Sequence, residues 1–169
     1  TIEPRKNVRF IVESFELIAH EYPDLHLVIA GKEGWLWNDI RTAMRTSPYA
    51  SRIHQIGFVD PEDKPYVYKA AKLFLYPSLY EGFPNVILES MASARVVIAS
   101  TIKPHEELII NNQNGFLIDL DDIEKASLEL KKIININSIE YTKIVSHGKK
   151  VVSQFSTKAI NNKIIDLLR

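Results

Sequence analysis

The stretch from Tyr76 to Ser100 constrains the fold more than any other part of the sequence. It reads YPSLYEGFPNVILESMASARVVIAS, which predicts the end of a strand, an acidic loop with a glycine, a helix and the next strand. A strand, a helix and a second strand in this order indicate a parallel sheet, because parallel strands need a crossover connection. In an open α/β sheet such a loop lies at the carboxyl ends of the strands, where ligands usually bind.

Pro84 is predicted to be the first residue of this helix, since it has no N–H to lose there and its φ suits the turn. The N–H groups just inside the helix, near Asn85 and Val86, would then have no intrahelical partner, and such a terminus attracts phosphates. Glu81 in the loop and Glu89 eight positions later place two carboxylates nearby. Many strand–loop–helix units bind nothing, so the residues alone leave a purely structural role equally open.

Up to about residue 120, short apolar runs alternate with segments in which the apolar residues have the spacing of a helix. This alternation predicts an α/β fold, with a Rossmann-like parallel sheet of about five strands, helices on both faces and a helical C-terminal tail. The helix near residue 60 is expected to begin with Asp60 as N-cap and Pro61 as its first residue. The expected strands are 25–31, 53–57, 73–76, 96–99 and 116–118, and the expected helices are 7–21, 36–45, 60–71, 104–110, 122–134, 139–153 and 156–168.

The composition limits the number of domains and the kinds of partner. A chain of 169 residues is long enough for one domain with a proper core, and its formal net charge of zero gives no reason to expect a nucleic-acid partner. The absence of cysteine excludes disulfides and thiolate metal sites. The chain begins with Thr1 and a loop-like segment, TIEPRKN, so we expect it to be a fragment of a longer protein.

Several segments together resemble one protein family. They are the Tyr76–Ser100 stretch with Glu81 and Glu89 separated by seven residues, EPRKN before a helix, LHLVIAG, IHQIGFVD, PEDKPYVYKAAKLFLYPS and the turn Asn114–Gly115. In these segments the chain is similar to the carboxyl-terminal domain of retaining glycosyltransferases of the GT-B fold, family 4, also called glycosyl transferases group 1. The resemblance covers roughly residues 1–120. The family's first strand, which precedes TIEPRKN, is expected to be missing.

The resemblance implies a function for the whole chain, residues 1–169. It would be the donor-binding half of an enzyme that moves a sugar from a nucleoside-diphosphate sugar to an acceptor with retention of configuration, in polysaccharide or glycolipid synthesis. Its implied partners are the nucleotide-sugar donor, the missing amino-terminal Rossmann-like domain and a glycan or lipid-linked acceptor. Neither a cofactor nor a metal is implied. A cytoplasmic location is expected, with peripheral contact at the inner face of the membrane through the missing domain as an option.

The resemblance also implies roles for individual residues. Glu81 would face the sugar near the reacting carbon, and Glu89 would accept hydrogen bonds from the ribose hydroxyls. Lys6, with Arg5 beside it, would bind the diphosphate, where negative charge develops as the nucleotide leaves. For each of them an ordinary solvated surface position is the alternative. The expected catalytic residues are Glu81 and Lys6, and the expected donor-binding residues are Glu89, Arg5, Gly82, Phe83, Pro84, Asn85, Val86, Gly31, Phe58 and Val59.

Two loops at the same edge of the sheet are expected to help bind the donor. Phe58 and Val59 would offer an apolar wall and backbone groups to the base, although Phe58 fits the core equally well. Gly31 and Gly34 flank a loop in which the missing Cβ atoms would let the backbone approach a ligand.

The sequence departs from the family pattern after the strand at 96–99. TIKPHEEL stands where many members have a Gly-Gly pair, so sugar contacts are in doubt there. The cluster His105-Glu106-Glu107 is expected to face solvent, and the five histidines lack the i, i+4 spacing of a helical zinc site.

Two other functions stay open, a non-catalytic Rossmann-like binding domain and a nucleotide-sugar epimerase of the same fold. A dinucleotide dehydrogenase is disfavoured because no GxGxxG opens a strand–helix unit.

Overall fold

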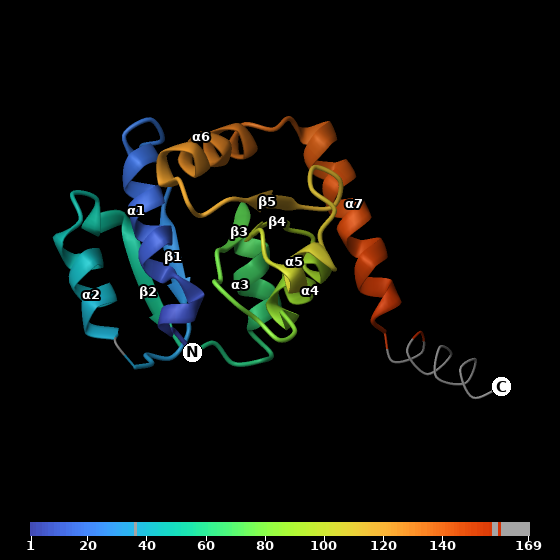
Figure 1. The fold of residues 1–169 in the computed structure, drawn as a ribbon, viewed down its shortest axis with the longest axis horizontal. Coiled ribbons are helices and arrows are strands. Elements are labelled where there is room, and N and C mark those ends of the chain that lie inside the picture. Colours follow the sequence, from blue (N-terminus) through green and yellow to red (C-terminus); the bar gives the residue numbers. More distant parts are fainter. Residues whose placement is uncertain (36, 157–158, 160–169) are drawn as a thin grey trace.

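A computed structural model describes residues 1–35, 37–156 and 159 (Figure 1). Strands and helices alternate as predicted, and no strand follows Ile118 in the described part of the chain. Single turns of 3-10 helix occur at Pro4–Lys6 and Ala50–Arg52. The elements are α1 (Val8–Ala19), β1 (Leu27–Ala30), α2 (Trp37–Thr46), β2 (Ile53–Gly57), α3 (Lys64–Ala70), β3 (Leu73–Tyr76), α4 (Asn85–Ala92), β4 (Val96–Ser100), α5 (Lys103–Glu106), β5 (Phe116–Ile118), α6 (Ile123–Ile134) and α7 (Ser138–Gln154).

All five strands pair in parallel, which confirms the predicted α/β class. They form two ladders, β1–β2 and β3–β4–β5, with Leu27 opposite Ile53 and Leu73 opposite Val96. Among the described strands only β4 has a neighbour on each side, and all five of its residues are buried. The residues of β3 stay partly exposed, because this strand pairs on one side only.

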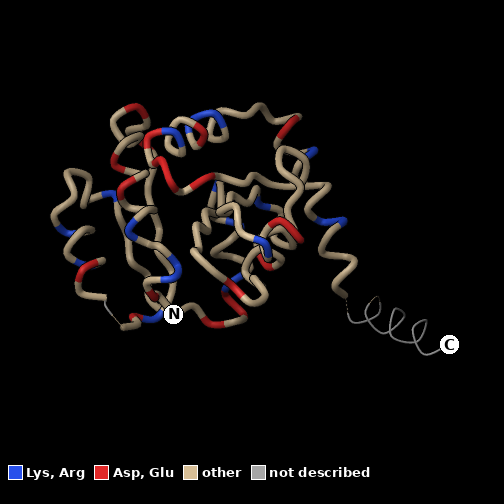
Figure 2. Tube along the Cα trace, in the orientation of Figure 1, with Lys and Arg blue, Asp and Glu red and all other residues tan. Residues whose placement is uncertain are grey.

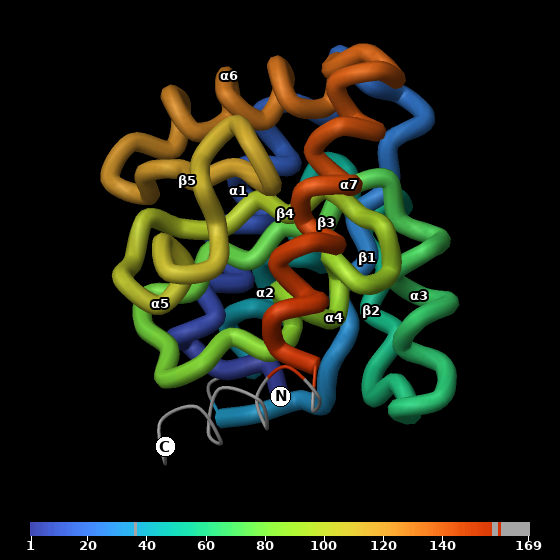
Figure 3. Tube along the Cα trace, turned by 90° about the vertical axis from the view of Figure 1, so that its right-hand side faces the viewer, coloured from blue at the N-terminus to red at the C-terminus, as the bar shows by residue number. Residues whose placement is uncertain are grey.

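Helices cover both faces of the β3–β4–β5 ladder. Successive residues of β4 point to opposite faces, so Ile98 packs with Leu130 of α6 while Val97 packs with Met91 of α4. The long helix α7 closes the side, packed against α4 and β4 (Figure 3). A separate apolar cluster joins α1 and α2 to one face of β1–β2. Burial of each of these large apolar side chains contributes roughly 1.5–3 kcal/mol to the free energy of unfolding.

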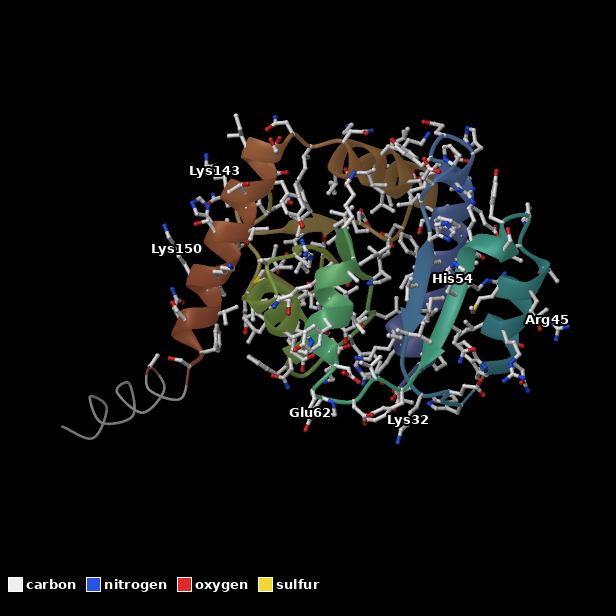
Figure 4. All side chains as sticks on the ribbon, turned by 180° about the vertical axis from the view of Figure 1, so that it is seen from behind. Lys32, Arg45, His54, Glu62, Lys143 and Lys150 are labelled. Carbon is white, nitrogen blue, oxygen red and sulfur yellow. The ribbon has the colours of Figure 1, made fainter. Side chains whose placement is uncertain are left out.

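The opening segment, residues 2–6, lies between the two ladders at the carboxyl ends of their strands. The Ile2 N–H donates to the Lys32 carbonyl just after β1, at 2.8 Å, and the Arg5 carbonyl accepts from the Leu79 N–H just after β3, also at 2.8 Å. Gly34 permits this course, because a Cβ there would lie 2.2 Å from the Ile2 carbonyl oxygen. Figure 4 shows Lys32 and Glu62 at this same edge of the molecule. The segment therefore delivers its basic side chains to the strand ends.

Three predicted helix boundaries were wrong. Helix α3 begins at Lys64 rather than Pro61, because the Lys64 N–H donates to the Asp60 carbonyl at 3.1 Å and closes a separate turn. Pro84 is the N-cap of α4 and not its first residue. The helix expected at 104–110 is the single turn α5. The helix expected at 156–168 falls outside the described residues, apart from 156 and 159.

Figure 2 shows acidic and basic segments interspersed, consistent with the net charge of zero. None of the described helices combines the length and hydropathy that a bilayer crossing requires.

Hydrogen exchange should report the different pairing of the strands. We expect backbone amides of β4 to exchange more slowly than those of β1 and β3, because β4 is hydrogen-bonded and covered on both sides. Amide exchange followed by NMR measures this order directly. Equal protection in β1 and β4 would contradict the two-ladder arrangement.

Candidate functional site

The Glu81 carboxylate is the centre of the candidate site. The chain leaves β3 after Tyr76, and the Glu81 side chain turns inward until it is only 7% exposed. Its Oε1 accepts hydrogen bonds from Lys6 Nζ at 2.6 Å, from the Tyr76 hydroxyl at 2.6 Å and from Ser78 Oγ at 2.7 Å. Its Oε2 accepts from Arg5 Nη1 at 2.8 Å. Four donors from two distant segments thus meet on one carboxylate.

These donors keep Glu81 ionised. Burial by itself would raise the pKa of Glu81, but hydrogen bonds from Lys6, Tyr76 and Ser78 outweigh it and lower the pKa to about 2. Burial, with the bond to Glu81, raises the pKa of the Tyr76 phenol, which therefore stays a neutral donor. At neutral pH the ionised Glu81 carboxylate therefore faces two cations, Lys6 and Arg5.

Lys6 and Arg5 are both engaged at this site. Lys6 also donates to the Tyr76 hydroxyl, and its Nζ lies 4.8 Å from the centre of the Tyr76 ring. Arg5 divides its guanidinium between Glu81 and Glu3, with 2.9 Å from Nε to the Glu3 carboxylate. The structure therefore brings Glu81, Lys6 and Arg5 together as the sequence predicts, while their roles toward a ligand stay predictions. A phosphate entering here would compete with Glu81 for both cations.

Glu89 lies on α4 and faces α3, with 36% of its side chain exposed. Lys64 Nζ lies 3.2 Å from its Oε1, and the Tyr68 hydroxyl donates to its Oε2 at 3.1 Å. The sequence reasoning did not identify Lys64 and Tyr68, although their i, i+4 spacing puts them on one helix face. Burial, followed by the nearby Glu89 charge, raises the pKa of Tyr68.

A row of three aromatic rings connects the surroundings of the two carboxylates. Tyr68, which bonds Glu89, meets Phe74 edge-on with ring centres 5.3 Å apart. Phe74 stacks with Tyr76, which bonds Glu81, with ring centres 5.8 Å apart. Glu81 and Glu89 thus stand at opposite ends of one aromatic row beside β3, and not on unrelated surfaces.

The loop and helix start between the two carboxylates are only partly as expected. Gly82 and Phe83 are exposed, and Phe83 lies near Phe155 of the segment after α7, with ring centres 5.7 Å apart. The Asn85 N–H has no partner within α4, as predicted, but it donates to the Phe83 carbonyl before the helix at 3.0 Å. The Val86 N–H makes no hydrogen bond to any described residue.

The ends of β1 and β2 decide between the two alternatives for Phe58 and show what lies beside Gly31. Phe58 is 56% exposed and has Lys32 Nζ 4.5 Å from its ring centre, so it does not belong to the core; Val59 is half-buried. The room beside Gly31 is taken by Ile2, whose Cγ1 would lie 3.1 Å from an added Cβ. Gly31 and Gly34 thus accommodate the chain's own opening segment, and contact of Gly31 with a donor stays a prediction.

His105 contradicts the prediction that the His105-Glu106-Glu107 cluster faces solvent. Its side chain is fully buried, while both glutamates are exposed. The α5 turn directs the imidazole inward, where Nδ1 lies 2.9 Å from the Ser100 carbonyl oxygen. His26 and His54 are exposed and stack on each other with ring centres 5.1 Å apart. Within the described residues no three His, Asp or Glu side chains are grouped so as to hold a metal ion.

The fold and the charged strand ends define a Rossmann-like α/β domain with a candidate ligand site at the carboxyl edge of its strands. The chain belongs to the family described as glycosyl transferases group 1, whose sequence profile matches residues 1–151.

Curated relatives are longer than this chain. It is 33% identical over 146 residues to the O-antigen chain mannosyltransferase B of Escherichia coli, covering 82% of this chain and 36% of that protein. It is 31% identical over 169 residues to the Escherichia coli UDP-Gal:alpha-D-GlcNAc-diphosphoundecaprenol alpha-1,3-galactosyltransferase, covering 97% of this chain and 42% of the relative. The chain thus spans about two fifths of the length of these relatives.

Solved structures share the fold. The C-terminal domain of the glycosyl transferase group 1 family protein LpcC from Francisella tularensis has a TM-score of 0.78 at 25% identity, over 90% of this chain and 80% of that one. HepE from Anabaena, in complex with UDP-glucose, has a TM-score of 0.85 at 21% identity, over 99% of this chain and 46% of that one.

Acid should remove the stabilisation that Glu81 contributes. The pKa of Glu81 is about 2 in the folded protein, whereas a glutamate in an unfolded chain has a pKa of about 4.3. Between these values the unfolded chain binds more protons, so the contribution is complete above about pH 5 and is lost as the pH falls towards 2. Glu81→Gln should cost about 1–3 kcal/mol of unfolding free energy at neutral pH, and less in acid.

Urea unfolding of the wild type and the Glu81→Gln variant, at neutral pH and at about pH 3, measures this difference. Glu129→Gln on α6 is the matched control, with little change expected at either pH. A Glu81→Gln cost that is the same at both pH values would contradict a depressed pKa for this carboxyl.

Proposed function

We propose that this chain is the donor-binding half of a glycosyltransferase that moves a sugar from a nucleoside-diphosphate sugar to an acceptor with retention of configuration. The observation that carries the proposal is the meeting of Glu81 with Lys6 and Arg5 at the carboxyl ends of the strands, in a chain of the group 1 family. Sugar transfer from a nucleotide needs an anion near the reacting carbon and cations at the departing diphosphate. This edge holds both kinds of group.

Lys6 and Arg5 would bind the diphosphate and stabilise the negative charge that develops as it leaves. Both side chains are long and partly exposed, at 19% and 27%, so they can turn from Glu81 to a phosphate without a change of backbone. The Val86 N–H at the start of α4 would add a neutral donor. The exchange replaces one anionic partner by another, and it leaves Glu81 with the donors Tyr76 and Ser78.

Glu81 would then act on the sugar as a fixed negative charge. A carboxylate with a pKa of about 2 is a weak base and stays ionised at neutral pH, which suits stabilising a positively charged sugar ring. We do not assign it as the nucleophile of a covalent intermediate, the role that a second carboxylate has in retaining glycoside hydrolases.

Glu89 would accept hydrogen bonds from the ribose, with Lys64 and Tyr68 orienting its carboxylate. The exposed ring of Phe58 and the neighbouring Val59 would contact the base at the ends of β1 and β2. In this arrangement the nucleotide extends along the strand ends, with its base above β2 and its diphosphate beside β3. The amino-terminal half of the longer protein would bring the acceptor.

Polysaccharide or glycolipid assembly is the setting that the relatives favour, since two of them are named for O-antigen and diphosphoundecaprenol substrates. The alternatives are a binding domain without chemistry and an epimerase. Incubating the full-length protein with a radiolabelled sugar nucleotide and a lipid-linked acceptor separates these classes. Label that moves to the acceptor supports a transferase, label that stays on an epimerised nucleotide supports an epimerase, and no reaction supports a binding domain.

Nucleotide binding should be visible as thermal stabilisation of the chain. We expect one of GDP, UDP or ADP to raise the melting temperature, because a ligand at 100 times its dissociation constant adds about 2.7 kcal/mol. Glu89→Gln should reduce the shift in melting temperature, since it replaces the carboxylate that accepts hydrogen bonds from the ribose. Glu129→Gln on α6 should leave the shift unchanged. No shift with any of the three nucleotides would favour the non-catalytic domain.

If Lys6 binds the diphosphate, removing its charge should weaken the binding of a nucleoside diphosphate. Lys6→Met keeps the length of the side chain and removes its charge, so the dissociation constant for the nucleoside diphosphate should rise about 10- to 100-fold. The affinity for the nucleoside without phosphates should stay unchanged. Isothermal titration calorimetry with both ligands measures the two effects, and an equal loss for both would remove the phosphate assignment.

A further inference from the structure

A buried row of polar groups lies behind Glu81. It consists of Ser78 after β3, Ser100 at the end of β4 and His105 on α5, and each of these residues is at most 1% exposed. Polar side chains buried to this degree are costly unless they are hydrogen-bonded. The hydrogen bonds of these three side chains therefore indicate their role.

The hydrogen bonds of this row run in one direction. His105 Nδ1 lies 2.9 Å from the Ser100 carbonyl oxygen, which can only accept, so Nδ1 carries the proton. The Ser100 hydroxyl donates to the Ser78 carbonyl, and Ser78 Oγ donates to Glu81 Oε1 at 2.7 Å. The row thus connects the α5 turn to the Glu81 carboxylate through two serines.

The imidazole is suited to this place only in its neutral form. His105 Nε2 is buried and makes no hydrogen bond within the described residues, so a proton on it would have no acceptor. Burial accordingly lowers the pKa of His105. The groups that face this ring include Tyr76, with ring centres 5.6 Å apart, and the charges of Glu81 and Lys6.

A bound diphosphate would draw Lys6 and Arg5 away from Glu81 but would leave this row in place. Lys6 and Arg5 are long, partly exposed side chains that a diphosphate would attract away from the carboxylate. Ser78 is short and fully buried, and its backbone is held by Ser100. While a nucleotide is bound, Glu81 would therefore keep two donors: Ser78, which this row holds in place, and Tyr76.

We propose that His105 is a positioning residue, which acts through Ser100 and Ser78 to hold the Glu81 carboxylate against the sugar once the diphosphate has taken Lys6 and Arg5. The proposal rests on the proposed function and deepens it. It predicts that His105 matters for the sugar part of the donor and not for the nucleotide part.

Two substitutions at His105 test this role. His105→Asn retains an N–H donor near the position of Nδ1, whereas His105→Leu removes it and keeps the site filled. Glu106→Gln, at the exposed neighbouring position on α5, is the matched control. Ser100→Ala breaks the same row with a smaller change, and it replaces His105→Leu if that variant does not fold.

The readout compares UDP with UDP-glucose, or GDP with GDP-mannose if the guanine nucleotide stabilises the chain more. Calorimetry should show the affinity of His105→Leu for the diphosphate within about twofold of the wild type, and its affinity for the sugar nucleotide about tenfold lower. His105→Asn should recover most of that loss. Equal affinities to the wild type for both ligands, or equal losses for both, would overturn the proposal.

A second measurement does not depend on any ligand. Carbon-detected NMR follows the titration of the Glu81 carboxyl, whose pKa should rise in His105→Leu because the Ser78 donor is no longer held, and should stay low in His105→Asn and Glu106→Gln. An unchanged titration in His105→Leu would overturn the proposal. If the wild type binds no sugar nucleotide, the proposed function fails, and the titration alone decides whether His105 positions Glu81.

Discussion

The ion pairs of Glu81 with Lys6 and Arg5 are the interaction on which the rest of this structure depends. The β1–β2 and β3–β4–β5 ladders share no strand pairing among the described residues, so other contacts must join them. The opening segment does so by hydrogen bonds to the loops after β1 and β3 and by its two cations, and α1 adds the buried Phe10, which packs in the cluster of β4 and α6. Burying a carboxylate costs several kcal/mol, and only a full set of donors offsets that cost. Four donors meet this requirement at Glu81.

The same arrangement suggests how one group of charges serves both the fold and a ligand. Without a ligand, Lys6 and Arg5 neutralise the acid that links the two ladders. In the proposed function a diphosphate would replace that acid as their partner, since both side chains are long and partly exposed. The acid would then keep its orientation through Tyr76 and the buried Ser78.

Periodicity in the sequence predicted most of the fold, since long apolar patterns such as those of α1, α6 and β4 leave little choice of structure. The meeting of Glu81 with Lys6 was also predictable, because the carboxyl ends of parallel strands share one edge and the family resemblance supplied the distant lysine. The start of α3 was not. Two Asp/Lys–Pro signals, Asp60-Pro61 and Lys64-Pro65, compete there, and the first closes a turn.

Other errors came from signals that two structures share. A four-residue helix has no periodicity to show which side faces inward, so the two exposed acids after His105 concealed a buried imidazole. The glycine pattern alone also did not reveal that Ile2 lies beside Gly31 and Gly34. The sequence shows that Lys64 and Tyr68 share one helix face, but it does not show that this face meets Glu89.

The most direct test of the account is to map where a sugar nucleotide touches the protein. Chemical shifts of isotopically labelled protein should be followed by NMR during titration with the sugar nucleotide that stabilises it most. We predict that the signals of Lys6, Glu81 and Glu89 move together with one dissociation constant, while those of His26 and His54 stay in place. Shifts confined to other surfaces, with Lys6 and Glu81 unaffected, would contradict a donor site at the carboxyl edge of the strands.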